Sequence, residues 1–233
     1  MNVLLFGATG MVGQGALREC LLADDVARVQ TIGRTATGQQ HPKLRELIHR
    51  DLFDYSAIEA DLMNFDACFF CIGVTSSGMS EDEYTRFTHD LTVAAAQTLA
   101  RLNPQMTFVY ISGAGADSSE TSKTMWARVR GRTENALQGL SFKAVYVFRP
   151  GIIQPLHGIR SKTDAYRWFY TLAWPVLPLL RRLLPNTVLS TQIVGRAMLA
   201  VARRGALGSD PIRAVLEAPQ ISAIGRSAEV QTK

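Results

Sequence analysis

Three glycines that directly follow an N-terminal apolar run constrain the fold of this chain more than any other feature. Residues 3–6 are apolar, and Gly7, Gly10 and Gly13 come next. In a strand–turn–helix unit, the first glycine permits the tight turn, the second lets backbone approach a pyrophosphate, and the third lets the helix pack close to the sheet. The spacing therefore predicts a phosphate-binding loop at a helix N-terminus, with a tight turn that binds nothing as the alternative. The other residues expected in this loop are Thr9, Met11 and Val12.

Further apolar runs recur along the chain at residues 29–32, 69–72, 108–111 and 145–148, with helical patterns between them. Continuous apolar runs are typical of strands that are buried on both faces of a parallel sheet. Ser80 and Glu83 have the spacing of a capping box before one helix, and Ser56 and Glu59 repeat that spacing before a shorter one. The alternation from residue 2 to about 150 predicts a Rossmann-type, doubly wound α/β fold.

The pattern changes after Gly151. Loops and a proline-broken apolar stretch lead to a helix expected near residues 192–203, and the residues after Ile224 are expected to be frayed. We interpret residues 1–233 as one NAD(P)-binding domain, in which about 154–190 form a small C-terminal lobe on the substrate side.

Charge and cysteine content exclude several classes of function. The net charge is +5, but the basic residues are dispersed, so no nucleic-acid partner is expected and a solvated basic surface is the simplest interpretation. The three cysteines, Cys20, Cys68 and Cys71, have no disulfide spacing, which indicates a reducing compartment. Cys68 and Cys71 lie three apart on an expected strand and point to opposite faces, so no metal site is predicted.

The sequence contains no obvious leader or membrane span. Residues 1–7 are better interpreted as a strand than as a secretory signal. The most apolar stretch, 168–180, is broken by Pro175 and Pro178 and is shorter than the roughly 20 residues that a bilayer span needs. We therefore expect a cytoplasmic monomer or homodimer. Peripheral membrane contact or subunit docking through this stretch is the less favoured alternative.

The residue at the end of the second expected strand selects the cofactor. An NAD site usually carries Asp or Glu about 20 residues after the glycine loop, to accept from the ribose 2′-hydroxyl. Here Arg34 stands 21 positions after Gly13, and no carboxylate is present. A guanidinium suits a 2′-phosphate, so NADP(H) is predicted over NAD(H), with an ordinary exposed arginine as the alternative.

Two further positions fit a cofactor site. Asp51 follows an expected third strand, where it could bond the adenine or merely cap a turn. Gly73 ends the fourth strand, where it permits close approach of the adenosine ribose or has no role beyond ending the strand. The neighbouring residues included in this expected site are Leu52, Cys71 and Ile72.

Seven stretches that run in order along the chain resemble one superfamily. They are GATGMVG, IGR, CIGVTSS, THDLTVAAA, ISGAGAD, RVRGRTENAL and FRPGII. Together they resemble the atypical branch of the short-chain dehydrogenases/reductases, which includes nucleoside-diphosphate-sugar epimerase-like proteins and the branch of the oxidoreductase-like Tat-interacting protein. The resemblance implies NADP(H) with its nicotinamide at the carboxyl edge of the sheet, beside Pro150, Gly151 and Ile152.

Enzymes of this superfamily use a Ser or Thr, a Tyr that transfers a proton, and a Lys four residues later. By position, Ser112 matches the hydroxyl residue, but Trp126 occupies the tyrosine place and Arg130 the lysine place. The indole N–H of Trp126 does not titrate near neutral pH, so it cannot transfer a proton. The pKa of a guanidinium is too high for Arg130 to lose its proton and act as a base. Arg130 can therefore hold a ribose, while proton transfer is lost.

Two functions therefore stay open. The first is an NADP(H)-dependent oxidoreductase or epimerase-like enzyme that acts on an unknown small molecule, with a proton donor from elsewhere, such as Tyr166 or Tyr170 in the lobe. The second is a catalytically inactive NADP(H)-binding redox sensor or protein-interaction module. Tyr110, on the strand face of Ser112, is expected to pack under a helix instead.

Overall fold

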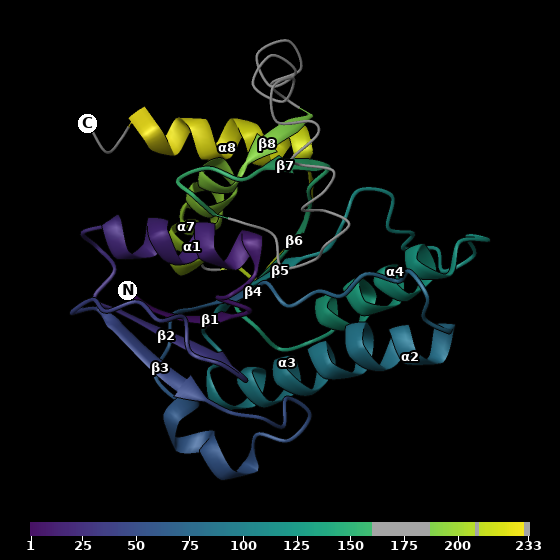
Figure 1. The fold of residues 1–233 in the computed structure, drawn as a ribbon, viewed down its shortest axis with the longest axis horizontal. Helices are drawn as coiled ribbons and strands as arrows, with labels where there is room; N and C mark the ends of the chain where they lie inside the picture. Colours follow the sequence, from purple (N-terminus) through teal and green to yellow (C-terminus); the bar gives the residue numbers. More distant parts are fainter. Residues whose placement is uncertain (160–186, 208–209, 231–233) are drawn as a thin grey trace.

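A seven-stranded parallel sheet forms the centre of the protein (Figure 1). The computed structural model describes residues 1–159, 187–207 and 210–230. The strand order β3-β2-β1-β4-β5-β6-β9 reverses direction between β1 and β4, which confirms the predicted Rossmann-type arrangement. The strands are β1 (Asn2–Phe6), β2 (Arg28–Gly33), β3 (Leu44–Ile48), β4 (Ala67–Phe70), β5 (Thr107–Ile111), β6 (Ala144–Arg149) and β9 (Ile212–Glu217).

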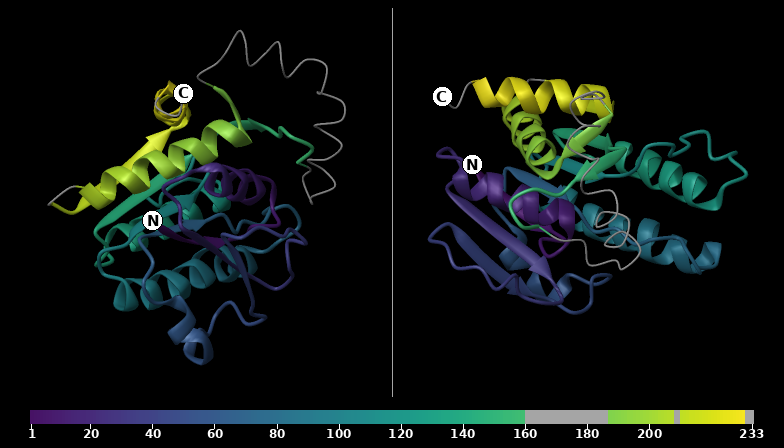
Figure 2. Two further views of the ribbon diagram at one scale, coloured as in Figure 1. Left: turned by 90° about the vertical axis from the view of Figure 1, so that its left-hand side faces the viewer. Right: turned by 45° about the horizontal axis from the view of Figure 1, so that its top comes forward.

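Helices cover both faces of this sheet, as Figures 1 and 2 show. One layer contains α1 (Met11–Leu22) and α7 (Thr191–Leu207), with α8 (Ala218–Val230) packed on α7. The opposite layer contains α2 (Glu81–Thr85), the π-helical turn η2 (Arg86–Asp90), α3 (Leu91–Leu102) and α4 (Met125–Gln138). A 3-10 helix, η1 (Ser56–Leu62), packs against α3, and β7 (Ile152–Gln154) pairs with β8 (Val188–Ser190) in a separate two-stranded sheet.

Burial on both faces explains the continuous apolar runs. In β5, Phe108 and Tyr110 enter the core under α3, whereas Val109 and Ile111 enter the core under α1 and α7. The predicted strands at 29–32, 108–111 and 145–148 are confirmed. The one at 69–72 is displaced, because β4 ends at Phe70.

The two cysteines of the CxxC pattern lie on opposite faces, as their spacing predicts. Cys68 is buried in the core under α3, and Cys71 packs against the core under α1. Both side chains are neutral thiols, because burial raises the pKa of each well above its ordinary value.

One of the two predicted capping boxes forms. The Ser80 backbone N–H donates to Glu83 Oε2 at 3.1 Å, and the Glu83 N–H donates to Ser80 Oγ at 3.2 Å. The prediction at Ser56 is wrong, because Ser56 is the first residue of η1 rather than its cap. Its backbone N–H donates to Asp54 Oδ1 at 2.9 Å, while Tyr55 occupies the N-cap position and no side chain caps η1 from there.

The segment that follows the expected lobe is part of the core. From Thr191 onward, α7 packs against α1, β9 pairs with β6, and α8 packs on α7. The expectation of fraying after Ile224 is wrong, because α8 continues to Val230. Most of the expected lobe at 154–190 lies outside the described residues, as do Tyr166, Tyr170 and the apolar stretch at 168–180. Among the helices that the structure describes, none has the length and apolar character to cross a membrane.

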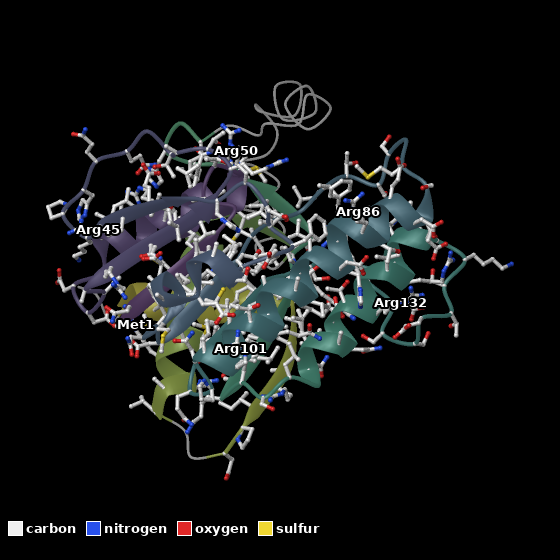
Figure 3. The ribbon with its side chains drawn as sticks, turned by 90° about the horizontal axis from the view of Figure 1, so that it is seen from below. Met1, Arg45, Arg50, Arg86, Arg101 and Arg132 are labelled. Atoms are coloured by element: carbon white, nitrogen blue, oxygen red, sulfur yellow. The ribbon has the colours of Figure 1, made fainter. Side chains whose placement is uncertain are left out.

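Arginines are spread over the face formed by β3 and the α2–α4 layer. Figure 3 labels five of them on this face: Arg45, Arg50, Arg86, Arg101 and Arg132. Arg101 forms an ion pair with Glu59 and Arg132 with Glu120, while the Arg86 guanidinium lies over the Phe53 ring.

The docking of α8 on α7 is testable at Gly225. A Cβ added there would lie 2.4 Å from the Ile193 carbonyl oxygen. We expect Gly225→Ala to lower the free energy of unfolding by about 1–3 kcal/mol, because the two helices must separate. Gly139→Ala is the matched control, since its Cβ would meet nothing closer than 3.5 Å. Equal urea denaturation midpoints for the two variants would contradict close packing of α8.

Candidate functional site

A long groove runs along the carboxyl ends of β1, β2, β4 and β5, at the point where the strand order reverses. Its volume is about 690 Å³. Most of the predicted cofactor residues line it, although they come from segments far apart in the sequence. They are Gly7, Thr9, Gly10, Met11, Val12, Arg34, Leu52, Cys71, Ile72, Gly73, Ser112 and Arg130.

Backbone contact at the glycine loop brings β1 and α1 together at one end of the groove. Gly7 has φ of +75°, and a Cβ there would lie 2.7 Å from the Cys71 carbonyl carbon. A Cβ on Gly13 would lie 2.1 Å from the Gly7 carbonyl oxygen, so Gly13 supports the loop from beneath and does not line the groove. A side chain at Gly13 would separate α1 from the end of β1, and one at Gly7 would collide with the backbone that follows β4.

The N-terminus of α1 is suited to an anion. Gly10 occupies the N-cap position, no side chain caps the helix, and its first turn contains no acidic residue. The first N–H groups of a helix have no intrahelical acceptor and carry the positive end of the helix dipole. A phosphate would complete their hydrogen bonding, so this loop fits a dinucleotide.

Arg34 lies exposed at the end of β2 and lines the groove beside Gly7 and Thr9. No hydrogen bond or ion pair of Arg34 occurs within the described residues. None of the described residues that line the groove is acidic. This end of the groove therefore offers a positive charge and no carboxylate.

The side chains of two predicted residues, Asp51 and Ile152, are directed elsewhere. Asp51 Oδ1 accepts from the Phe53 backbone N–H at 2.9 Å, so its side chain caps a turn while the next residue, Leu52, lines the groove. Ile152 is half-exposed because successive strand residues alternate in direction, and Ile153 points inward in its place.

A second cavity, here called the side cavity, opens from the groove and has a volume of about 520 Å³. Both spaces share the lining residues Met11, Val12, Ile111, Ser112 and Arg130. The side cavity is otherwise lined by Val74, Thr75, Ser76, Tyr84, Gly113, Ala114, Trp126, Pro150, Gly151 and Ile153. The five shared residues form the junction between the two spaces, and Pro150 and Gly151 line only the side cavity.

Helix α4 presents Trp126 and Arg130 to the side cavity one turn apart, as their spacing predicts. A Cβ on Gly115 would lie 3.2 Å from a ring carbon of Trp126, so the indole packs on that glycine. The Arg130 guanidinium stands at the junction with the groove, between Gly73 and Gly113, and would lie 3.9 Å from a Cβ on either.

Tyr84 is a site residue that sequence reasoning missed. Arg130 Nε donates a hydrogen bond to the Tyr84 hydroxyl at 3.0 Å, and both residues line the side cavity. Tyr84 is 1% exposed although it belongs to a short, acidic helix, α2. A lone aromatic residue in an otherwise polar turn indicated an inward face, but only the folded chain reveals its partner.

Ser112 forms a hydrogen bond with the buried carboxylate of Glu134, a residue that sequence reasoning also missed. Its Oγ donates to Glu134 Oε1 at 2.5 Å, and Arg149 Nη2 donates to Glu134 Oε2 at 2.5 Å. The Glu134 side chain is 0% exposed and Arg149 is 14% exposed, so this is a buried ion pair. The Ser112 hydroxyl can accept a further hydrogen bond, but its proton is engaged. The sequence signal that could have indicated Glu134 was its position on α4, one turn beyond Arg130.

Tyr110 packs in the core, as expected, and lines neither space. Burial raises the pKa of Tyr110 to about 12, although nearby Arg130 opposes the shift. Burial also acts to lower the pKa of Arg130, but Tyr110 and Tyr84 more than offset it, so the pKa lies above its usual value. The junction therefore holds one permanent positive charge, Arg130, hydrogen-bonded to the Tyr84 hydroxyl.

Sequence comparison identifies the family. No family model matches the chain. Over 165 residues, it is 30% identical to mitochondrial FMP52 of Saccharomyces cerevisiae, which covers 70% of this chain and 69% of that protein. This chain belongs to the atypical short-chain dehydrogenases/reductases. In this family, it is also 27% identical to mitochondrial fmp52-2 of Aspergillus oryzae, over 95% of this chain and 96% of that protein. Rat HTATIP2 is 26% identical, over 80% and 81%.

Coverage differs among the fungal relatives. The match to mitochondrial fmp52 of Emericella nidulans spans 66% of that protein, somewhat less than two thirds.

The names of the fungal relatives contradict the expected cytoplasmic location, which was wrong to infer from the lack of a secretory signal and a membrane span. Organelle addresses are read by receptors and are not a consequence of hydropathy alone.

Solved structures share the fold of this atypical short-chain dehydrogenase/reductase. A short-chain dehydrogenase/reductase family oxidoreductase from Burkholderia thailandensis matches with a TM-score of 0.66 and 15% identity, over 100% of this chain and 97% of that one. The Bordetella bronchiseptica enzyme WbmF, solved in complex with NAD⁺, matches with a TM-score of 0.66 and 15% identity, over 99% and 78%. At these identities the likeness concerns the fold.

The buried pair of Glu134 and Arg149 is expected to dominate the stability of the site. Glu134→Ala removes the acceptor of the Ser112 hydroxyl and leaves the Arg149 guanidinium with only Glu217 and Ser118 as acceptors among the described residues, so we expect a loss of about 1–3 kcal/mol in the free energy of unfolding. Glu59→Ala removes an exposed ion pair with Arg101 and should cost less than about 1 kcal/mol. Denaturant unfolding of both variants checks this, and similar losses would contradict a special role for Glu134.

Proposed function

We propose that this chain is an NADP(H)-dependent oxidoreductase that reduces a small carbonyl compound. The observation that carries the proposal is the composition of the groove. Its loop end has an uncapped helix N-terminus, its β2 end has Arg34 and no acid, and its inner end opens into a separate cavity. This arrangement suits a dinucleotide laid across the switch point with a substrate beside its reactive end.

Each part of the groove has a role in this proposal. The backbone at Gly10 and Met11 binds the pyrophosphate, Arg34 binds the 2′-phosphate, and Leu52 and Ile72 pack on the adenine. Gly73 leaves room for ribose, and Arg130 holds the second ribose at the junction. The remaining residues that line the loop and its supports are Gly7, Thr9, Val12, Gly13 and Cys71, with Pro150 and Gly151 beside the nicotinamide. When bound, the cofactor supplies a hydride, and the protein supplies position and charge.

The comparisons support a coarser form of this proposal. Structural neighbours are named as an oxidoreductase and as a complex with NAD⁺, so a nicotinamide cofactor is the natural expectation for this chain. The preference for the 2′-phosphorylated form rests on Arg34 alone. The fungal relatives named as mitochondrial proteins support a mitochondrial location.

A second function is favoured by a different observation. Trp126 replaces the family's tyrosine, and the Ser112 proton is donated to Glu134, so two of the expected groups cannot transfer a proton. On that basis the chain would be an NADP(H)-binding sensor or interaction module without turnover. Turnover of an aldehyde by the purified protein with NADPH excludes this alternative.

Binding and turnover are measured separately. Titration of NADPH, followed by enhancement of its fluorescence, is expected to saturate, and NADH is expected to bind at least 10-fold more weakly. Consumption of NADPH with a panel of aromatic aldehydes then tests catalysis. Absence of NADPH binding overturns both functions, whereas binding without turnover of any aldehyde favours the sensor.

The role of Arg34 gives a specific prediction. Arg34→Ala removes charge-assisted hydrogen bonds to the 2′-phosphate, each worth about 1.5–3 kcal/mol, so NADPH affinity should fall at least 10-fold. NADH affinity should stay unchanged, because NADH has no 2′-phosphate. Arg45→Ala is the matched control, since Arg45 is exposed on β3 and does not line the groove. Equal losses for both nucleotides would show that Arg34 does not discriminate between them.

A further inference from the structure

The side cavity contains a phenol beside a cation, although the helix position that normally supplies the phenol holds Trp126. In related enzymes a tyrosine and a lysine on one helix form this pair. Here Arg130 comes from α4 and Tyr84 from α2, and Arg130 Nε donates to the Tyr84 hydroxyl at 3.0 Å. Helices α2 and α4 pack against each other, so the pair is held by tertiary contact.

We propose that Tyr84 is the proton donor of this enzyme and that the side cavity accepts a flat, apolar compound with one carbonyl group. The proposal rests on the proposed NADP(H)-dependent reduction. It adds the catalytic group and the substrate class, which neither the groove nor the comparisons assign.

The hydrogen bonding of Tyr84 suits a donor. Its oxygen accepts from Arg130, and no acceptor for its own proton occurs among the described residues, so that proton is available to a ligand. After donation, the negative charge would rest on an oxygen already bonded to a guanidinium. Such charge-assisted hydrogen bonds are about twice as strong as neutral ones.

Other groups that line the side cavity are less suitable. The Ser112 proton is engaged by Glu134, and Trp126 has no titrating group near neutral pH. Thr75 and Ser76 have aliphatic hydroxyls, which are much weaker acids than a phenol. Tyr110 does not line the cavity. Among the described lining residues, Tyr84 is therefore the one phenol.

The walls of the side cavity indicate the substrate class. Arg130 is the sole charged group among the described residues that line it, and its Nε is already used by Tyr84. Apolar side chains form most of the remaining surface: Met11, Val12, Val74, Ile111, Trp126 and Ile153. An indole face favours stacking with a planar ring. The space has a volume of about 520 Å³, which suits a small aromatic substrate together with the nicotinamide ring beside Pro150 and Gly151.

The proposed step is a two-electron reduction of the carbonyl group. The carbonyl carbon accepts a hydride from NADPH, the π pair of the C=O bond moves onto oxygen, and that oxygen takes the proton of Tyr84. The carbonyl compound is thereby reduced to an alcohol, and NADPH is oxidised to NADP⁺. The Tyr84 phenolate then regains a proton from water.

The test uses a carbonyl probe that reports hydrogen bonding without turnover. The probe is 4-dimethylaminocinnamaldehyde, an aromatic aldehyde whose absorption moves to longer wavelength when its carbonyl accepts a strong hydrogen bond. With the NADP⁺-loaded full-length protein, we expect binding and a red shift. Tyr84→Phe removes only the hydroxyl, so we expect the shift to be lost, and NADPH-driven reduction of the aldehyde to fall by about 10²–10⁴-fold.

Tyr146→Phe is the matched control. The Tyr146 hydroxyl is buried on β6 without a hydrogen-bond partner in the described residues, and it lies in the core under α7, away from the cavity. This variant should retain the red shift and the turnover. Melting curves and NADPH titration of Tyr84→Phe establish that it folds and binds cofactor. Trp126→Tyr, added to Tyr84→Phe, should restore part of the shift by returning a phenol to the cavity.

The outcomes separate the two levels of the proposal. If NADPH does not bind to the wild type, the proposed function fails and the role of Tyr84 fails with it. If NADPH binds but the aldehyde does not, the proposed substrate class is wrong. If Tyr84→Phe keeps the red shift, Tyr84 is not the donor. In both cases the cofactor site stands. Loss of both shift and turnover in Tyr84→Phe alone, with cofactor affinity unchanged, supports the assignment.

Discussion

Contact between two stretches of backbone at Gly7 and Gly13 is the constraint on which the rest of the site depends. A Cβ on Gly13 would lie 2.1 Å from the Gly7 carbonyl oxygen, so α1 packs at backbone distance on the end of β1. This contact brings the N-terminus of α1 to the point where the strand order reverses. Because the chain leaves the paired strands β1 and β4 toward opposite faces of the sheet, the groove that Arg34 and Arg130 line is a consequence of the topology.

Helix α4 supplies three residues that form the junction and its surroundings. Trp126, Arg130 and Glu134 follow one another at four-residue intervals, and each faces a different environment. Trp126 packs on Gly115 in the side cavity, Arg130 reaches the junction, and Glu134 is fully buried against Arg149. One helical stripe therefore forms an apolar wall, a fixed positive charge and a buried ion pair.

The buried ion pair has a consequence for the hydroxyl that the family uses. Glu134 needs hydrogen bonds to both oxygens because it is shielded from water, and Ser112 supplies one of them. Its proton is then unavailable to a substrate. With position 126 occupied by an indole, the protein keeps a cation at the junction and relies on α2 for a phenol, which places the reactive pair on two elements.

The sequence by itself determined the strands β1, β2, β5 and β6, the glycine loop, Arg34 at the end of β2 and the i, i+4 placement of Trp126 and Arg130, because each depends on local spacing. Only the tertiary structure decided that β9 and α8 complete the core, that Asp51 caps a turn instead of lining the groove, and that Ile153 replaces Ile152 at the side cavity. The pairing of Tyr84 with Arg130, 46 residues apart, and of Ser112 with Glu134 likewise required the fold. Their contacts depend on how α2, α4 and β5 pack, and side-chain burial across separate elements has no signature in local sequence periodicity.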